Sequence, residues 1–208
     1  MFADLARDDV FRLETPRLWL RWPRAADAAA IERYSSLWEV ARNTSRIPHP
    51  YPPGSAERFI FAAREGNASG RDLTLVVTTL KAPREAIGAI SLETRGGDRL
   101  ALGYAFSPDV WGKGFASEAA AAIVGAGFTL TTATAIHASA IVENEASKRV
   151  LEKVGFAFVD RGLEGAPARG AMRECDRFVL ARERWLQGRA TIAKLSNGAS
   201  APRPALRP

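Results

Sequence analysis

The sequence contains one cysteine, and this scarcity limits the chemistry available to the chain. Cys175 is the single cysteine among 208 residues, so an intrachain disulfide is excluded. No histidine lies close to it in the sequence, which disfavours a catalytic thiol. This cysteine usage fits a reducing compartment, and we expect Cys175 to be a small, partly buried side chain.

The sequence also lacks a long hydrophobic run. No stretch of eighteen apolar residues occurs, which disfavours a membrane-spanning helix. The first residues, MFADLARDDVFRL, are charged and do not contain the apolar segment of a signal peptide. We therefore expect a cytoplasmic protein. Hydrophobic residues make up 47% of the chain and charged residues 25%, which is the profile of a soluble globular domain.

Acidic residues become scarce towards the end of the chain. Residues 161–208 contain ten Lys and Arg but four Asp and Glu, whereas residues 1–160 contain nineteen of each sign. The last stretch is also rich in Pro, Gly, Ser and Ala, so we expect one domain over 1–187 and a basic, disordered tail over 188–208. No basic stripe interleaved with aromatic residues appears before the tail, so we do not expect nucleic-acid binding.

The first third of the chain predicts short elements separated by breaks. Arg17–Trp22 (RLWLRW) alternates polar and apolar residues, as a half-buried strand does, and 25–41 is typical of a helix. Four prolines between Pro48 and Pro53 exclude regular structure there. The next helix is expected to begin at an N-cap, Ser55, and to end at Gly66.

The rest of the chain predicts a mixed fold with an antiparallel centre. Strands are expected over 72–80, 85–93 and 99–107, and the short turns between them favour a meander. A helix beginning near Ser117, a strand over 135–142 and a helix from Asn144 to Gly155 follow. Two closing strands, 156–160 and 174–185, complete the pattern, and the second is expected to run into a short helix. The class is α/β (α+β) with helices flanking a mostly antiparallel sheet.

A glycine-rich turn, PDVWGKGFASEAAAAIV (residues 108–124), directly precedes a helix. Helix N-termini expose unpaired N–H groups and a partial positive charge, and glycines let a phosphate approach the backbone closely. Gly112, Lys113, Gly114, Phe115 and Ala116 could thus cradle a pyrophosphate, although an ordinary strand-to-helix turn is equally compatible. Neither a nucleotide-triphosphate P-loop nor a dinucleotide fingerprint fits, because the Ser or Thr of the first and the third glycine of the second are absent.

Two long motifs together carry a family resemblance. GYAFSPDVWGKGFASEA, followed by NEASKRVLEKVGF, closely resembles the GNAT acetyltransferases, in particular the RimJ/RimL type. Phe115 replaces the more usual Tyr of the first motif. The strand region LETPRLWLRW is also similar to that group, so the resemblance extends over roughly residues 12–185.

The resemblance implies a GNAT-like fold whose central sheet is splayed at an acetyl-CoA site, with acetyl-CoA as co-substrate and no metal. It implies that Asn144 contacts the pantetheine and that Ser147 lies near the thioester sulfur. The other implied cofactor-binding residues pair with the pantetheine arm or hold the pyrophosphate: Phe106, Ser107, Trp111, Gly112, Lys113, Gly114, Phe115, Ala116 and Ser117.

The resemblance also implies which residues are candidates for the catalytic acid and base. Many GNAT proteins use a Tyr acid at the position that is Leu151 here, so Ser147 becomes the expected acid. Glu93, at the end of a predicted strand, is the carboxylate that we assign as general base. His137, His49 and a water chain to solvent remain open alternatives for that role.

The predicted activity is transfer of an acetyl group from acetyl-CoA to a primary amine by direct attack. The subgroup resemblance favours a protein N-terminal amine, and small-molecule amines remain open. A longer acyl-CoA donor and a non-catalytic CoA-binding or regulatory module are the alternatives. No membrane partner is expected, and a homodimer is compatible with the sequence.

Overall fold

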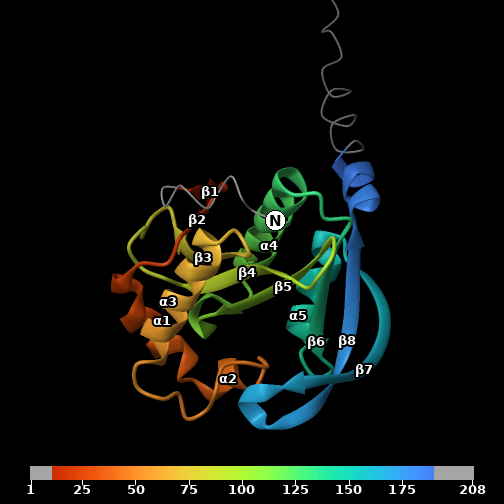
Figure 1. Cartoon of the computed structure of the whole chain (residues 1–208). Coiled ribbons are helices and arrows are strands. Elements are labelled where there is room, and N and C mark those ends of the chain that lie inside the picture. The colour runs from red at the N-terminus through yellow and green to blue at the C-terminus, as the bar shows by residue number, and fades with distance from the viewer. Residues whose placement is uncertain (1–10, 190–208) are drawn as a thin grey trace, which may run out of the picture.

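The computed structural model describes residues 11–189, which form one mixed β-sheet with helices on both faces (Figure 1). The strands are β1 (Arg12–Glu14), β2 (Leu18–Arg21), β3 (Asp72–Thr79), β4 (Gly88–Thr94), β5 (Arg99–Phe106), β6 (Ala135–Ile141), β7 (Ala157–Ala166) and β8 (Ala171–Ala181). The α-helices are α1 (Ala28–Ser35), α2 (Trp38–Ala41), α3 (Ser55–Ala68), α4 (Phe115–Leu130) and α5 (Glu145–Val154). Short 3₁₀ turns are η2 (Ala25–Asp27), η3 (Pro108–Val110) and η4 (Pro167–Arg169).

The sheet divides between β5 and β6. Its strand order is β1-β2-β3-β4-β5-β6-β8-β7, and every neighbouring pair is antiparallel except β5 and β6. These two parallel strands pair only over Arg99–Ala101 with Ala135–His137. Beyond that point β5 continues to Phe106 and β6 to Ile141 without pairing with each other, so the sheet opens between them. The predicted meander and the splayed, mostly antiparallel sheet are confirmed.

Two hydrophobic cores hold the helices against opposite faces of the sheet. On β3, Leu75 and Val77 belong to the core beneath α4, whereas Val76 between them belongs to the core beneath α1 and α3. Burial on both faces explains why residues 73–78 of this strand are all buried instead of alternating between buried and exposed. Helix α4 is rich in alanine but has only 16 residues. None of the helices within residues 11–189 is long and apolar enough to cross a membrane.

The prediction of a single helix over 25–41 is wrong. It divides into η2, α1 and α2, because Ser36 donates its hydroxyl to the Glu32 carbonyl at 2.7 Å and Leu37 has an extended backbone with ψ 131°. A serine hydroxyl that bonds back to the i−4 carbonyl slightly destabilises a helix and often bends it.

Both boundary signals predicted for α3 are corrected. The N-cap is Gly54, whose φ of 74° is left-handed, and Ser55 is the first helical residue. Gly66 lies inside the helix, which ends two residues later. A Cβ on Gly66 would come within 2.9 Å of the Asp72 carboxylate, so this glycine permits close packing on β3 and does not end the helix.

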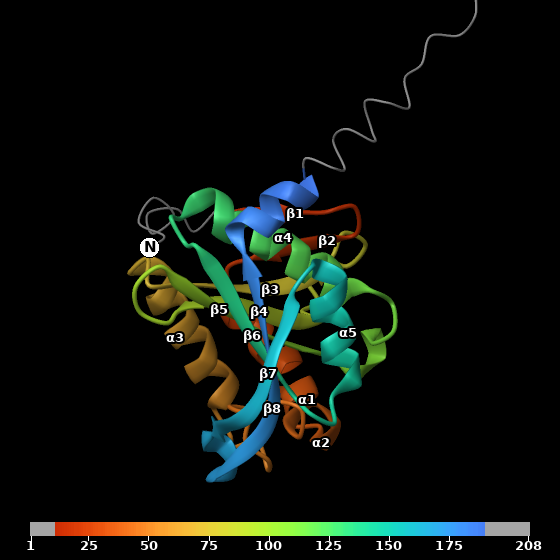
Figure 2. The same cartoon turned by 90° about the vertical axis from the view of Figure 1, so that its right-hand side faces the viewer.

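The last two strands form a hairpin that is longer than expected (Figure 2). The strand predicted over 156–160 continues to Ala166, and its partner starts at Ala171 and ends at Ala181. Residues 182–189 are helical, as expected, and Trp185 packs on Phe128 with ring centroids 5.2 Å apart. Of the predicted tail over 188–208, two residues belong to this helix, and residues 190–208 lie outside the described part of the chain.

Candidate active site

A cavity of about 830 Å³ occupies the opening between β5 and β6. Its walls come from both strands, the start of α4, one face of α5, the loop over 43–48 and the β7–β8 hairpin. Ten of the twelve predicted site residues line it: Glu93, Phe106, Trp111, Gly112, Gly114, Phe115, Ala116, Ser117, Asn144 and Ser147. The structure thus brings both sequence motifs to one site.

The N-terminus of α4 is open towards this cavity. Gly112 and Gly114 have φ of 73° and 77°, in the left-handed region that glycine adopts without strain. No side chain caps the helix, and its first internal hydrogen bond runs from the Glu118 N–H to the Gly114 carbonyl at 3.1 Å. The N–H groups of residues 115–117 therefore have no acceptor within the helix, and together with the helix dipole they favour an anion.

Glu118 fixes this helix end to the N-terminal strands. One of its carboxylate oxygens accepts from the Thr15 hydroxyl at 2.6 Å and from the Arg17 N–H at 3.0 Å. The other accepts from the Arg17 guanidinium at 2.6 Å, which also donates to the Lys113 carbonyl. Burial alone would raise the pKa of Glu118, but these donors outweigh it and lower the pKa below its ordinary value.

Two predicted cofactor residues, Ser107 and Lys113, do not line the cavity. The Ser107 N–H donates to the Ile87 carbonyl at 2.9 Å, on the side of β4. Because backbone groups alternate along an antiparallel pair, the N–H and C=O of its neighbour Phe106 point away from β4, and of these the C=O already accepts from Trp111. The Lys113 ammonium turns back to donate to the Asp109 carbonyl at 2.8 Å, which leaves the backbone of the turn facing the cavity.

Trp111 closes the end of β5. Its indole N–H donates to the Phe106 carbonyl at 2.9 Å, and its backbone N–H donates to the Pro108 carbonyl at 3.0 Å. The backbone N–H of Trp111 is therefore already bonded, and the free donors of the turn begin with Gly112.

The N-terminus of α5, on the other side of the cavity, is capped. The Asn144 side-chain oxygen accepts from the Ser147 N–H at 3.0 Å, which confirms the predicted N-cap. The Ser147 hydroxyl lies 2.8 Å from the Tyr104 hydroxyl of β5. Burial raises the pKa of Tyr104 to about 12, although the hydrogen bond with Ser147 opposes this shift.

Two carboxylates line the described part of the cavity, and their environments differ. Glu93 accepts from both terminal nitrogens of Arg46, at 2.5 and 2.7 Å, so its oxygens already have a cationic partner. Glu164, on β7, accepts from the Ser139 hydroxyl at 2.7 Å. The assignment of Glu93 as base thus stays a prediction, and Glu164 is a second candidate.

The two histidines lie apart from these groups. His137 is on β6, and burial together with the charge of Arg99 lowers its pKa. The ring of His49 stands 5.3 Å from that of Trp38. Neither histidine is among the residues that line the cavity.

Sequence reasoning did not assign functions to four residues that shape the site: Tyr104, Arg17, Glu118 and Glu164. A signal existed for three of them. Tyr104 follows the glycine of the first motif, Glu118 stands in the same motif after the glycine turn, and Arg17 belongs to LETPRLWLRW. Glu164 has no local pattern that marks it, because its partner Ser139 is distant in the sequence.

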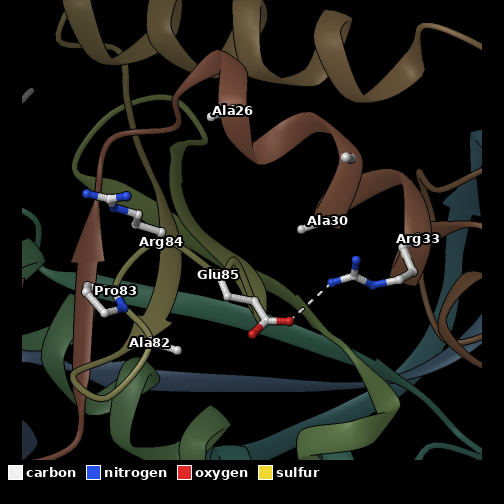
Figure 3. Close-up of a pocket in the computed structure, with 8 residues that line it drawn as sticks. Ala26, Ala30, Arg33, Ala82, Pro83, Arg84 and Glu85 are labelled. Carbon is white, nitrogen blue, oxygen red and sulfur yellow. Dashed lines mark hydrogen bonds and ion pairs between the residues drawn. The ribbon is translucent and has the colours of Figure 1, made fainter.

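A second hollow, of about 510 Å³, lies between α1 and residues 82–85 (Figure 3). Alanines form much of its wall, and its rim carries an exposed ion pair of Arg33 and Glu85 at 3.4 Å. No predicted site residue lies there. Neither hollow offers a metal site, since no group of three or more Asp, Glu, His or Cys within residues 11–189 is placed to hold an ion.

Comparison with known proteins defines the class of this fold and site. A family model described as the acetyltransferase (GNAT) domain matches residues 17–157. An uncharacterized N-acetyltransferase of Bacillus subtilis, YoaA, is 32% identical over 152 residues, which span 69% of this chain and 81% of that protein. The chain therefore belongs to the GNAT acetyltransferase family.

Solved structures share the fold at lower identity. Spermidine N-acetyltransferase from Vibrio cholerae, in complex with CoA and spermine, is 18% identical, with a TM-score of 0.69 over 83% of this chain and 99% of that one. RimJ from Mycobacterium smegmatis, in complex with CoA-disulfide, is 22% identical, with a TM-score of 0.67 over 86% of this chain and 93% of that one. The GNAT-like fold expected from the sequence is confirmed.

Proposed function

We propose that this protein is an N-acetyltransferase of the RimJ/RimL type that transfers the acetyl group of acetyl-CoA to a primary amine. One observation carries the proposal: the uncapped N-terminus of α4 and the Ser147 hydroxyl of α5 face the same opening in the sheet. The first suits the diphosphate of CoA, and the second suits the sulfur of its thioester.

The residues around the opening fit acetyl-CoA. A Cβ added at Gly112 would meet nothing within 4 Å, and at Gly114 it would meet only Arg17, at 3.4 Å, so the backbone is accessible to a phosphate. We assign the pyrophosphate to the N–H groups of Gly112, Gly114 and residues 115–117. The backbone N–H of Phe106, which points away from β4, and the amide of Asn144 would hold the pantetheine arm.

The chemistry requires an uncharged amine and a leaving thiolate. The amine attacks the thioester carbonyl, a C–N bond forms, the C–S bond breaks, and its electron pair passes to sulfur. We propose that Glu164 removes the amine proton, because Glu93 is paired with Arg46; Glu93 stays the alternative. Ser147 would donate a hydrogen bond to the sulfur. Positioned acids and bases of this kind each contribute roughly 10²–10⁴-fold.

The acceptor is proposed to be a protein N-terminal amine, on the strength of the RimJ/RimL motifs. On β5, the residues whose side chains alternate with the buried ones are Ala101, Gly103 and Ala105, and all three line the cavity. These small side chains leave room for a chain end to approach the sheet. Polyamines and other small amines are the competing acceptors.

The test is release of CoA from acetyl-CoA with peptides of varied N-terminal residue, polyamines and aminoglycosides. Turnover with a peptide that is lost when its N-terminus is blocked would support the proposal. Binding of acetyl-CoA without turnover on any amine would contradict it and would indicate a CoA-binding module. Comparing Glu164→Gln with Glu93→Gln assigns the base. The variant that lacks the carboxylate acting as base should lose its activity near neutral pH, and the other variant should keep it.

A further inference from the structure

The opening in the sheet is crossed by a hydrogen bond between two hydroxyl groups. Tyr104 belongs to β5, on one side of the opening, and Ser147 belongs to α5, which follows β6 on the other side. The Tyr104 Oη lies 2.8 Å from the Ser147 Oγ and 3.3 Å from the Ser147 carbonyl oxygen. The Tyr104 ring is held beside Phe106, with centroids 6.3 Å apart, and packs against the core beneath α4.

We propose that Tyr104 is a positioning residue that aims the Ser147 hydroxyl proton into the cavity, towards the thioester sulfur. This inference rests on the proposed function. It assigns a function to a residue for which the sequence motifs gave none.

The two distances decide how the hydroxyl protons are arranged. If Tyr104 donated to the Ser147 carbonyl, the Ser147 hydroxyl would donate to Tyr104 and be unavailable to a ligand. The contact to the carbonyl is 3.3 Å, which is long for an O–H···O bond, whereas 2.8 Å to the hydroxyl is the usual length. Either hydroxyl can donate across the 2.8 Å contact, and we assign Tyr104 as the donor to Ser147 Oγ, which leaves the Ser147 proton free to point into the cavity.

Tyr104 acts through a hydrogen bond and keeps its own proton. Burial raises its pKa to about 12, while a thiol ordinarily has a pKa of about 8.5. Passing a proton from Tyr104 through Ser147 to sulfur would thus create the less stable anion. The leaving thiolate instead accepts a hydrogen bond from Ser147, and it takes its proton later from water.

The experiment is a double-mutant cycle with acetyl-CoA and an amine that the wild-type protein acetylates. Tyr104→Phe keeps the ring and removes the hydroxyl. We expect kcat to fall about tenfold, a part of the roughly 10²-fold fall expected for Ser147→Ala. The affinity for acetyl-CoA, the KM for the amine and the melting temperature should stay close to wild type. In a Ser147→Ala background, Tyr104→Phe should lower kcat by less than about twofold, because its hydroxyl no longer has a serine to orient.

Three results would overturn the inference. They are an unchanged kcat in Tyr104→Phe, a change confined to KM or to acetyl-CoA affinity, and an undiminished effect of Tyr104→Phe in the Ser147→Ala background. Each of these leaves the proposed function intact, because the wild-type protein turns over in every case. Failure of the wild-type protein with all amines is a different result and would contradict the proposed function itself.

Discussion

The two helices that flank the opening begin in different ways. α4 starts after a left-handed glycine, Gly114, and no side chain caps it. α5 starts after Asn144, whose side chain accepts the Ser147 N–H at 3.0 Å. Both helices face the same physical problem, since the first N–H groups of any helix lack an intrahelical acceptor.

The difference indicates what each helix end does. At α5 the protein satisfies its own N–H group, so this end is fixed and serves to hold Ser147 in place. At α4 the first N–H groups have no side-chain cap, and stability is provided from outside the turn by Glu118 with Thr15 and Arg17. An uncapped helix end supported in this way is prepared for an anion such as the diphosphate of CoA.

The largest expected effect comes from removing the hydroxyl that the capped helix holds. In Ser147→Ala the cap survives, because Asn144 binds the backbone N–H and not the side chain. We expect melting temperature and acetyl-CoA affinity close to wild type and a fall in kcat of roughly 10²-fold. Steady-state kinetics beside calorimetry provide the measurement. Full activity of Ser147→Ala would show that Ser147 is not a catalytic residue.

The next effect comes from closing the open helix end. Gly114→Val places a β-branched residue at φ 77°, a strain of about 1–3 kcal/mol, in the path of the phosphate. We expect acetyl-CoA affinity to fall at least about tenfold by calorimetry, since each 1.4 kcal/mol is a factor of ten.

A matched control separates strain from binding. Gly54 also begins a helix, α3, at a left-handed φ of 74°, and it is not among the residues that line the cavity. Gly54→Val should lower the melting temperature comparably and leave acetyl-CoA affinity near wild type. Equal affinities for the two variants would contradict the assignment of the pyrophosphate to the α4 turn.

A smaller effect is expected from the glutamate that supports the open end. The lowered pKa of Glu118 means that its carboxylate stabilises the fold above the ordinary carboxyl pKa, and this stabilisation is lost as pH falls through the lowered pKa. The melting difference between Glu118→Gln and wild type should therefore be larger at pH 7 than at about pH 3. Glu145→Gln, at the first turn of α5, is the control: its pair with Lys148 is solvent-exposed on the glutamate side and should contribute little.

The smallest expected effect is that of removing the cap of α5. Asn144→Ala should cost about 1 kcal/mol of stability, or roughly 2–4 °C in melting temperature, and should weaken acetyl-CoA binding modestly. Asn144→Asp retains a capping oxygen and should recover the melting temperature. Identical melting of Asn144→Ala and wild type would show that the cap contributes nothing.

The elements with local signals could be predicted from the sequence. α5 has an Asn cap at one end and a left-handed glycine, Gly155, at the other, and its bounds agree with the prediction. The β7–β8 hairpin was predicted too short, because Gly162, Gly165 and Pro167 within and beside it are typical of a loop. Pairing with a partner strand, which local composition does not reveal, makes this segment extended.

The same limit applies to the site. The glycine turn and the α5 start are contiguous motifs, so most of their residues that line the cavity could be identified in advance. Tyr104 and Ser147 are 43 residues apart, and Arg17 and Glu118 are 101 apart. Their contacts depend on how the sheet and helices assemble, and the motifs alone specify neither the pairing nor its geometry.

The most direct test of the open and capped helix ends is an amide NMR titration with CoA. We predict that the N–H resonances of Gly112, Gly114 and residues 115–117 shift most, as a phosphate binds groups that lacked an acceptor. The Ser147 N–H, already bonded to Asn144, should move less. Saturation with CoA that leaves the α4 turn unchanged while other amides shift would contradict the account.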